Sequence, residues 1–163
     1  MPTITLIAAV SADGFISRGS GVPWHLPADI AHFRHATAGK WLLLGRRTYD
    51  EMRGWFDDSH TPLVLTHAPE LKGPGRAVSS VAEALALAAS QTELMVCGGG
   101  QIYAAMMPHA TCLWITRVQT QLSGGVAFPV VDSDVWEVVS TQPRSADREH
   151  EFAMEFVCLQ RRR

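Results

Sequence analysis

The stretch ELMVCGGGQIYAAMMP, residues 93–108, predicts the fold class of this chain. Its first half is a short apolar run of the kind that forms a buried strand. Three consecutive glycines follow, and the remainder reads as a helix that ends at Pro108. A strand that leads through a tight turn into a helix is the repeating unit of α/β folds with a parallel sheet.

Strands and helices alternate before this stretch, and strands follow it alone. The predicted strands are residues 3–11, 40–45, 61–66, 75–80, 112–120, 135–142 and 151–160. The predicted helices begin at Pro27 and cover residues 46–52 and 81–90, the last behind a capping box of Ser80 and Glu83. Residues 12–24 are expected to form a loop. The order predicts one α/β domain, residues 1–163, with a central mixed, mostly parallel sheet, flanking helices on both faces and an antiparallel C-terminal edge made by the last two strands.

Composition narrows the class of partner. The 163 residues are 47% hydrophobic and 18% charged, with a net charge of −2. That balance indicates neither a nucleic-acid nor a membrane partner. The three widely spaced cysteines favour reduced thiols in a cytoplasmic protein over disulfides or a metal site. We therefore expect a cytoplasmic protein that is not secreted.

Asp29 is the most informative single residue. A helix from Pro27 places Asp29 on one face with Ile30 and Phe33, so a carboxylate lies on the apolar side. Trp24, Ile30 and Phe33 are candidate pocket walls, and a carboxylate among them could bind a planar cationic or amidine-like group. The alternative is a first-turn carboxylate that only complements the helix dipole.

The histidines give little indication of a metal. His32 and His35 could share a helix face, but that face is expected to lie opposite the pocket, and no cysteine or carboxylate cluster accompanies them. We expect His25, His32 and His35 to be solvated and no metal to be bound.

Two strand-to-helix junctions have features that attract phosphate. At the first, Gly45 ends a strand and Arg46, Arg47 and Thr48 open a helix, where free N–H groups and added positive charge would meet an anion. At the second, Gly98–Gly100 removes every side chain from the turn, so backbone can approach a ligand closely. A simple tight turn and a solvated arginine pair remain alternatives at each site.

Six motifs in order, LIAAVSADGFI, VPWHLPADIAHFR, LLLGRRTYDEM, MVCGGGQIY, LWITRV and the late FP at 128–129, make nearly the whole chain similar to the dihydrofolate reductase family. The resemblance implies reduction of 7,8-dihydrofolate to tetrahydrofolate with NADPH as cofactor. It implies catalytic roles for Asp29, which would bind N3 and the 2-amino group of the pterin, for Thr116, which would support that carboxylate, and for Trp24.

The resemblance also implies the binding residues. Those for substrate are Ile7, Ala8, Ile30, Phe33, Arg34, Met52, His60, Cys97 and Tyr103. Those for NADPH are Ala9, Ile16, Gly45, Arg46, Arg47, Thr48, Thr66, His67, Gly98, Gly99, Gly100, Gln101, Ile102 and Tyr103. Residues 12–24 resemble the family's mobile loop, and the family's first Gly-Gly peptide bond is cis. Dihydrofolate and antifolate inhibitors are the implied partners, and a monomer is expected.

Three positions depart from the family pattern. Gln101 replaces a basic residue near the adenosine end of the cofactor, and Gly125 replaces an acid that helps to fix the mobile loop in some members. His60 stands where an arginine is expected to bind the glutamate tail of the substrate. These departures keep two alternatives open. One is a reductase of the same fold that acts on another pteridine or on a ribosylated pyrimidine of flavin synthesis, and the other is a non-catalytic nucleotide- or folate-binding protein.

Overall fold

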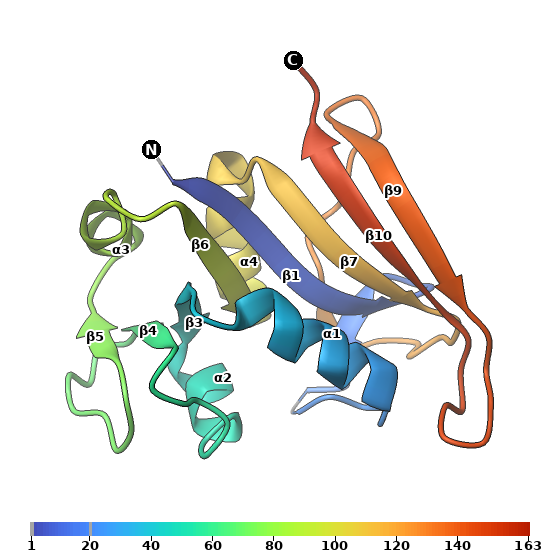
Figure 1. Cartoon of the computed structure of the whole chain (residues 1–163), viewed down its shortest axis with the longest axis horizontal. Coiled ribbons are helices and arrows are strands. Elements are labelled where there is room, and N and C mark those ends of the chain that lie inside the picture. Colours follow the sequence, from blue (N-terminus) through green and yellow to red (C-terminus); the bar gives the residue numbers. More distant parts are fainter. Residues whose placement is uncertain (1, 20) are drawn as a thin grey trace.

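One large sheet organises the molecule. The computed structural model describes residues 2–19 and 21–163, and eight of its strands pair in the order β5-β4-β3-β6-β1-β7-β10-β9 (Figure 1). These strands are β1 (Thr3–Ser11), β3 (Trp41–Gly45), β4 (Thr61–Leu65), β5 (Arg76–Val78), β6 (Glu93–Gly98), β7 (Cys112–Val118), β9 (Trp136–Arg144) and β10 (Met154–Arg161). All pairs from β5 to β7 are parallel, and β10 pairs antiparallel with both β7 and β9. The predicted mixed sheet and its antiparallel edge are confirmed.

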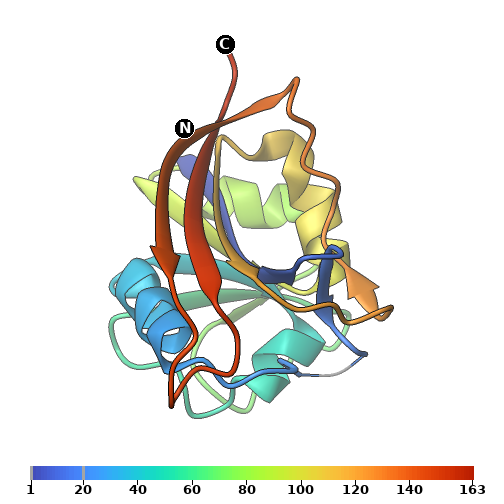
Figure 2. The same cartoon turned by 90° about the vertical axis from the view of Figure 1, so that its right-hand side faces the viewer.

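Helices cover both faces of this sheet, as predicted. They are α1 (Pro27–Thr37), α2 (Arg46–Glu51), α3 (Val81–Leu87) and α4 (Gly100–Met106), which continues into a 3₁₀ turn, η1 (Met107–His109). Leu43 faces the core shared with α3 and α4, while its neighbours Leu42 and Leu44 face the core shared with α1 and α2. Figures 1 and 2 show the two helical layers on either side of the strands. The alternation follows from the pleat, which sends successive side chains to opposite faces.

Several predicted boundaries differ from the structure. The predicted loop 12–24 contains a short strand, β2 (Phe15–Ser17), which pairs with β8 (Val126–Ala127), and Ser20 of that loop lies outside the described residues. β9 runs past Pro143, which an edge strand tolerates because one side of its backbone needs no partner. The predicted strand from 151 begins at Met154, and the helix predicted over 81–90 ends at Leu87.

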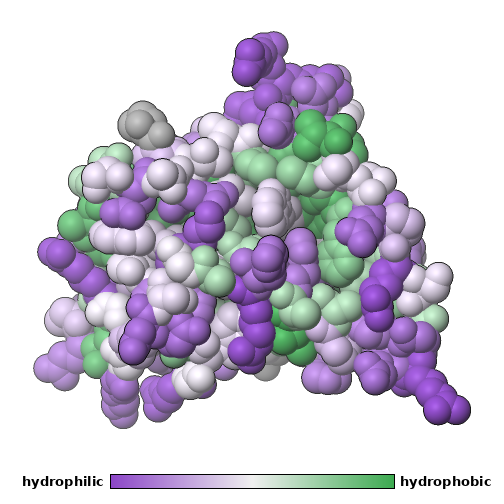
Figure 3. Space-filling model, viewed as in Figure 1, coloured by the Kyte–Doolittle hydropathy of each residue, from purple (hydrophilic) through white to green (hydrophobic). Residues whose placement is uncertain are grey.

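Polar and apolar side chains are mixed on the face that α1 covers. Figure 3 shows hydrophilic side chains along its lower edge and at its top, with hydrophobic side chains exposed between them. Within residues 2–19 and 21–163, no helix has the length and apolar character needed to cross a membrane. The same residues hold no group of three or more histidine, cysteine or carboxylate side chains able to bind a metal ion.

Candidate active site

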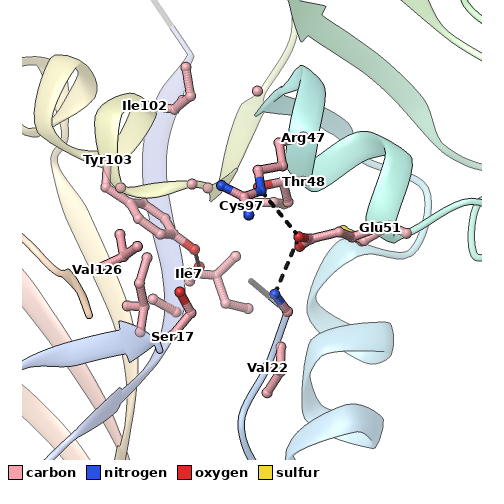
Figure 4. Close-up of a pocket in the computed structure, with 18 of the residues that line it drawn as sticks. Ile7, Ser17, Val22, Arg47, Thr48, Glu51, Cys97, Ile102, Tyr103 and Val126 are labelled. Atoms are coloured by element: carbon pink, nitrogen blue, oxygen red, sulfur yellow. Dashed lines mark hydrogen bonds and ion pairs between the residues drawn. The ribbon is translucent and has the colours of Figure 1, made fainter. Parts of the chain in front are cut away.

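A cleft of about 1010 Å³ opens at the carboxyl ends of the parallel strands. Gly45, Leu65 and Gly98, at the ends of β3, β4 and β6, line it together with residues of β1 and β7. Ligands of open α/β sheets gather at this edge, because the strand-to-helix turns converge there. Figure 4 shows residues from β1, α2 and α4 around the same space.

Asp29 lies in this cleft on the first turn of α1, with its side chain half-buried. The hydroxyl of Thr116, a buried residue of β7, donates a 2.6 Å hydrogen bond to Asp29 Oδ1. Burial raises the pKa of Asp29, while the bond from Thr116 and the nearby His32 oppose that rise. The other lone pairs of the carboxylate remain available to a ligand that offers two N–H donors side by side.

The wall around Asp29 is apolar and contains one unsatisfied donor. The indole N–H of Trp24 is buried without a hydrogen-bond partner within the described chain, so a polar atom of a ligand or a water must satisfy it. Tyr103 donates a 2.7 Å hydrogen bond to the carbonyl of Ile7, which fixes the ring against β1. Burial raises the pKa of Cys97 to about 12, so this thiol stays protonated and serves as apolar wall.

The structure brings almost all of the predicted residues to one cleft. Lining it from the predicted catalytic and substrate sets are Asp29, Thr116, Trp24, Ile7, Ala8, Ile30, Phe33, Met52, Cys97 and Tyr103. Lining it from the predicted cofactor set are Ala9, Ile16, Gly45, Arg46, Arg47, Thr48, Thr66, His67, Gly98, Gly99, Gly100, Gln101 and Ile102. Their roles remain predictions, but a shared cleft is the arrangement those roles require.

The glycines at the second junction occupy positions where a side chain would overlap its neighbours. The Gly98–Gly99 peptide bond is cis, and Gly98 has a φ of 113°. A Cβ on Gly98 would lie 3.2 Å from the Tyr103 ring, and one on Gly100 would lie 2.6 Å from Val126. Glycine at these two positions is therefore required by the packing of the turn against Tyr103 and Val126, and the turn itself lines the cleft without side chains.

Arg46 is already partnered within the protein. Its Nε lies 3.2 Å from both carboxylate oxygens of Asp50, and its Nη1 donates to the carbonyls of Ala68 and Glu70. These bonds tie the start of α2 to the segment that follows β4. The side chain of Arg47 is 74% exposed, and its Nε lies 3.7 Å from a carboxylate oxygen of Glu51. Arg46 is thus held at several points, whereas Arg47 is mostly exposed and makes one long ion pair among the described residues.

Two predicted substrate residues do not line the cleft. The guanidinium of Arg34 lies over the Trp55 ring, 4.4 Å from its centre. The side chain of His60 is 6% exposed, and its Nδ1 accepts a 3.0 Å bond from the Asp57 amide. The ring of His60 packs against Phe56, with the ring centres 6.0 Å apart, and does not line the cleft.

The expectation for His32 was wrong. Instead of being solvated on the opposite face, His32 lines the cleft, is half-buried and packs against Phe156 and Trp114 at ring-centre distances of 4.6 and 5.8 Å. Burial lowers its pKa. A spacing of three residues from Asp29 places the two side chains side by side on a helix, and that signal was present in the sequence.

Glu51 is a cleft residue that the sequence reasoning missed. Its Oε1 accepts a 3.2 Å bond from the amide of Gly21 and lies 3.7 Å from Arg47 Nε, as the dashed lines in Figure 4 show. It therefore joins α2 to the segment that precedes Trp24. The sequence signal for Glu51 is its spacing from Arg47, since an acid four positions after an arginine lies on the same face of a helix.

Asp13 supplies an acid near the position of Gly125. Its carboxylate accepts bonds from the amides of Leu122 and Ser123, at 3.0 and 2.8 Å, and from the hydroxyl of Ser11 at 2.6 Å. Gly125 has a φ of 114°, and a side chain there would overlap the carbonyl of Ser17. An acidic residue at 125 would be strained in this conformation, whereas the carboxylate of Asp13 binds the segment before β8 from another part of the chain.

Comparisons with known proteins agree with the geometry. A family model described as dihydrofolate reductase matches residues 3–161. The chain is 37% identical over 161 residues to dihydrofolate reductase type 3 of Salmonella typhimurium, covering 98% of this chain and 99% of that one. It is 30% identical to dihydrofolate reductase of Bacillus subtilis, covering 98% and 95%. A structure of dihydrofolate reductase from Enterococcus faecalis, complexed with NADP(H) and RAB-propyl, superposes with a TM-score of 0.89 at 29% identity over 99% of this chain and 97% of that one.

Proposed function

The chain belongs to the dihydrofolate reductase family, and on that premise we propose that the cleft around Asp29 is where it reduces 7,8-dihydrofolate to 5,6,7,8-tetrahydrofolate with NADPH. The observation that carries this assignment is a single carboxylate, Asp29, in an apolar cleft with Thr116 as its one side-chain hydrogen-bond partner among the described residues. A pterin presents adjacent N–H donors on one edge, which match the two oxygens of a carboxylate.

Asp29 binds and orients the pterin in this proposal. It accepts hydrogen bonds from N3 and the 2-amino group, and its negative charge favours protonation of the bound ring. Thr116 holds Oδ1 from β7, so the carboxylate keeps one orientation while substrate arrives and product leaves. Phe33 and Ile7 enclose the ring and exclude water, which strengthens each polar contact in the site.

The rest of the cleft receives the cofactor. When bound, NADPH would supply the hydride that goes to C6 of the pterin and would leave as NADP⁺, while N5 would take a proton from water. The glycine turn 98–100 and the start of α2 would hold its phosphates, and Arg46, Thr66 and His67 would hold the 2′-phosphate. The buried N–H of Trp24, which has no partner within the described chain, fits a polar ligand atom or a water bound beside the pterin.

One observation favours a second candidate, a reductase of the same fold for a substrate without a glutamate tail. His60, which stands where the tail-binding arginine is expected, does not line the cleft, and neither does Arg34, a predicted substrate residue. Another pteridine, or a ribosylated pyrimidine of flavin synthesis, would need no such contact.

NADPH oxidation decides between the two. We expect turnover with 7,8-dihydrofolate at a kcat/KM well above that for a tail-less dihydropterin or a ribosylated pyrimidine. Asp29→Asn should lower that turnover by orders of magnitude, whereas Asp58→Asn, at an exposed position, should leave it unchanged. Faster turnover of a tail-less substrate would support the second candidate, and an active Asp29→Asn enzyme would contradict both.

We further propose that the protein acts as a monomeric single domain in the cytoplasm. In support, strands from Thr3 to Arg161 belong to one sheet, and one chain lines the cleft. Cys97, Cys112 and Cys158 are all free, which suits a reducing compartment. Light scattering coupled to gel filtration should give the mass of one chain, and the mass of a dimer would contradict the proposal of a monomer.

Small diaminopyrimidine antifolates, which offer the same edge of hydrogen-bond donors as the pterin, are expected ligands of Asp29.

A further inference from the structure

His150 is buried outside the cleft and contacts the helix that carries Asp29. It lies in the turn between β9 and β10 and is only 1% exposed. Its Nε2 accepts a 2.9 Å hydrogen bond from the amide of Ala28, 122 residues earlier in the chain. Figures 1 and 2 both show this turn beside the start of α1.

The second ring nitrogen is held by Asp147. His150 Nδ1 lies 2.8 Å from Asp147 Oδ1, and the same oxygen accepts the amides of Glu149 and His150. Since the Ala28 amide can only donate, Nε2 must be the acceptor, and the ring proton therefore sits on Nδ1 and points at Asp147. The carboxylate thus selects the tautomer that can bind α1.

The start of α1 needs this acceptor. Leu26 occupies the N-cap position and has no side chain that could accept a hydrogen bond, and Pro27 has no amide hydrogen. The carbonyl of Leu26 accepts the amides of Asp29 and Ile30, which leaves the Ala28 amide for His150. A residue distant in sequence therefore does what a serine or aspartate N-cap usually does.

We propose that His150, oriented by Asp147, is a positioning residue for the Asp29 carboxylate. The Ala28 amide directly precedes Asp29, so His150 fixes the backbone of the first turn while Thr116 fixes the side chain. Leu26, Val118 and Met154 form a buried apolar cluster beside these contacts, which keeps the turn and the helix together. This inference rests on the assignment of Asp29 as the pterin-binding carboxylate.

Two substitutions at residue 150 test separately the hydrogen bond that the ring accepts and the space that the ring fills. His150→Leu fills similar space without an acceptor, whereas His150→Gln places an amide oxygen near the position of Nε2. We expect His150→Leu to lower kcat/KM for dihydrofolate about tenfold, mainly through KM, and His150→Gln to recover most of that loss.

The pKa of Asp29, followed by the ¹³C shift of its carboxyl group, is the readout that a general loss of stability would not move. A looser first turn weakens the bond from Thr116, which normally lowers this pKa, so the pKa should rise in His150→Leu. Thr37→Val is the matched control, because it removes a buried hydroxyl that donates to the Phe33 carbonyl at the other end of α1. It should cost stability without moving the pKa of Asp29.

The inference is overturned if His150→Leu matches Thr37→Val in KM and in the pKa of Asp29, or if His150→Gln is as impaired as His150→Leu. Should His150→Leu not fold, Asp147→Ala is the test, because it keeps the imidazole but no longer fixes the ring proton on Nδ1. KM for dihydrofolate and the pKa of Asp29 should then change in the same direction as in His150→Leu, but by less. ¹⁵N shifts of the His150 ring should show a proton on Nδ1 whatever Asp29 binds. An active Asp29→Asn enzyme would contradict the proposed function, while an inactive one beside a normal His150→Leu would contradict only this inference.

Discussion

Thr116 and Asp29 meet at 2.6 Å across 87 residues of sequence, and their bond joins β7 to α1 inside the cleft. Because it is directed at an ionised oxygen, this bond contributes more than a neutral one, about 1.5–3 kcal/mol. Thr116→Val should therefore raise the pKa of Asp29 and lower kcat/KM for dihydrofolate roughly tenfold to hundredfold.

The matched control for Thr116→Val is Thr5→Val. Thr5 is fully buried on β1 and donates a 2.7 Å bond to Glu93, also a carboxylate, but it does not line the cleft. Both variants should lose stability, and steady-state kinetics should change only in Thr116→Val. Equal kinetic effects would mean that the hydroxyl of Thr116 acts through the sheet rather than through Asp29.

Asp29→Asn should make the protein more stable while it removes activity. Burial raises the pKa of Asp29 in the folded protein above its value in the unfolded chain, so ionisation of this group opposes folding. The cost is complete at pH values above the folded pKa and disappears as the pH falls to the unfolded value. Thermal unfolding at neutral pH should therefore show a higher Tm for Asp29→Asn, with the difference shrinking under acid conditions. A lower Tm at neutral pH would contradict this reading.

Arg46 should set the preference for NADPH over NADH. Asp50 and two backbone carbonyls hold its guanidinium at the cleft, so its charge is placed before the cofactor binds. Arg46→Ala should raise KM for NADPH roughly tenfold to hundredfold and change KM for NADH much less. Arg53→Ala is the control, since Arg53 also pairs with Asp50, at 3.8 Å, but does not line the cleft. An equal effect on both cofactors would place Arg46 at the pyrophosphate instead.

The order of strands and helices could be predicted because each element carries its own signal. Residues 3–11 form β1 as expected, since an apolar, β-branched run suits a strand that is covered on both faces. Ser80 accepts the Glu83 amide at 3.0 Å, as the capping box predicts. Short strands such as β2 lack that signal, because three residues show no usable period and the pairing with β8 decides them.

A site residue could be predicted from the sequence where its side chain did not suit its expected surroundings. A carboxylate on the apolar face of a helix pointed to Asp29 directly, whereas Thr116 came only from the family resemblance. The cap from His150 could not be predicted, because Ala28 and its acceptor lie 122 residues apart and nothing local links them. The role of His60 could not be predicted for a different reason, because the position of a residue in a loop does not fix where its side chain points.

His60 should be a structural residue rather than a tail-binding one. Its ring is buried against Phe56, with the ring centres 6.0 Å apart, and its Nδ1 accepts the Asp57 amide. His60→Arg would force a longer, charged side chain into the space that the buried ring fills and would remove the acceptor of the Asp57 amide, so it should lower the free energy of unfolding by about 2 kcal/mol. KM for dihydrofolate should stay the same. His109→Arg, at an exposed position, should change neither quantity, and a lower KM in His60→Arg alone would restore a role in tail binding.

Asp13 should control how the cofactor side of the cleft is held. Its carboxylate joins the turn before β2 to the segment before β8, and Ile16, Ser17 and Val126 from those two strands line the cleft. Asp13→Ala should therefore raise KM for NADPH and slow hydride transfer, which a larger deuterium isotope effect on kcat would reveal.

The pH dependence of the same contact has a definite sign. The bond from Ser11 and those from two backbone amides hold the pKa of Asp13 below its usual value. The stabilisation that ionised Asp13 gives to the fold is therefore present at pH values above its unfolded pKa of 3.8 and is lost as the pH falls through the folded pKa.

Asp132→Ala is the control for Asp13→Ala, because Asp132 accepts the Asp134 amide at 2.8 Å in an exposed turn that does not line the cleft. If both variants leave the isotope effect and KM for NADPH unchanged, Asp13 only shapes its own turn, and β2 and β8 are held by their pairing alone.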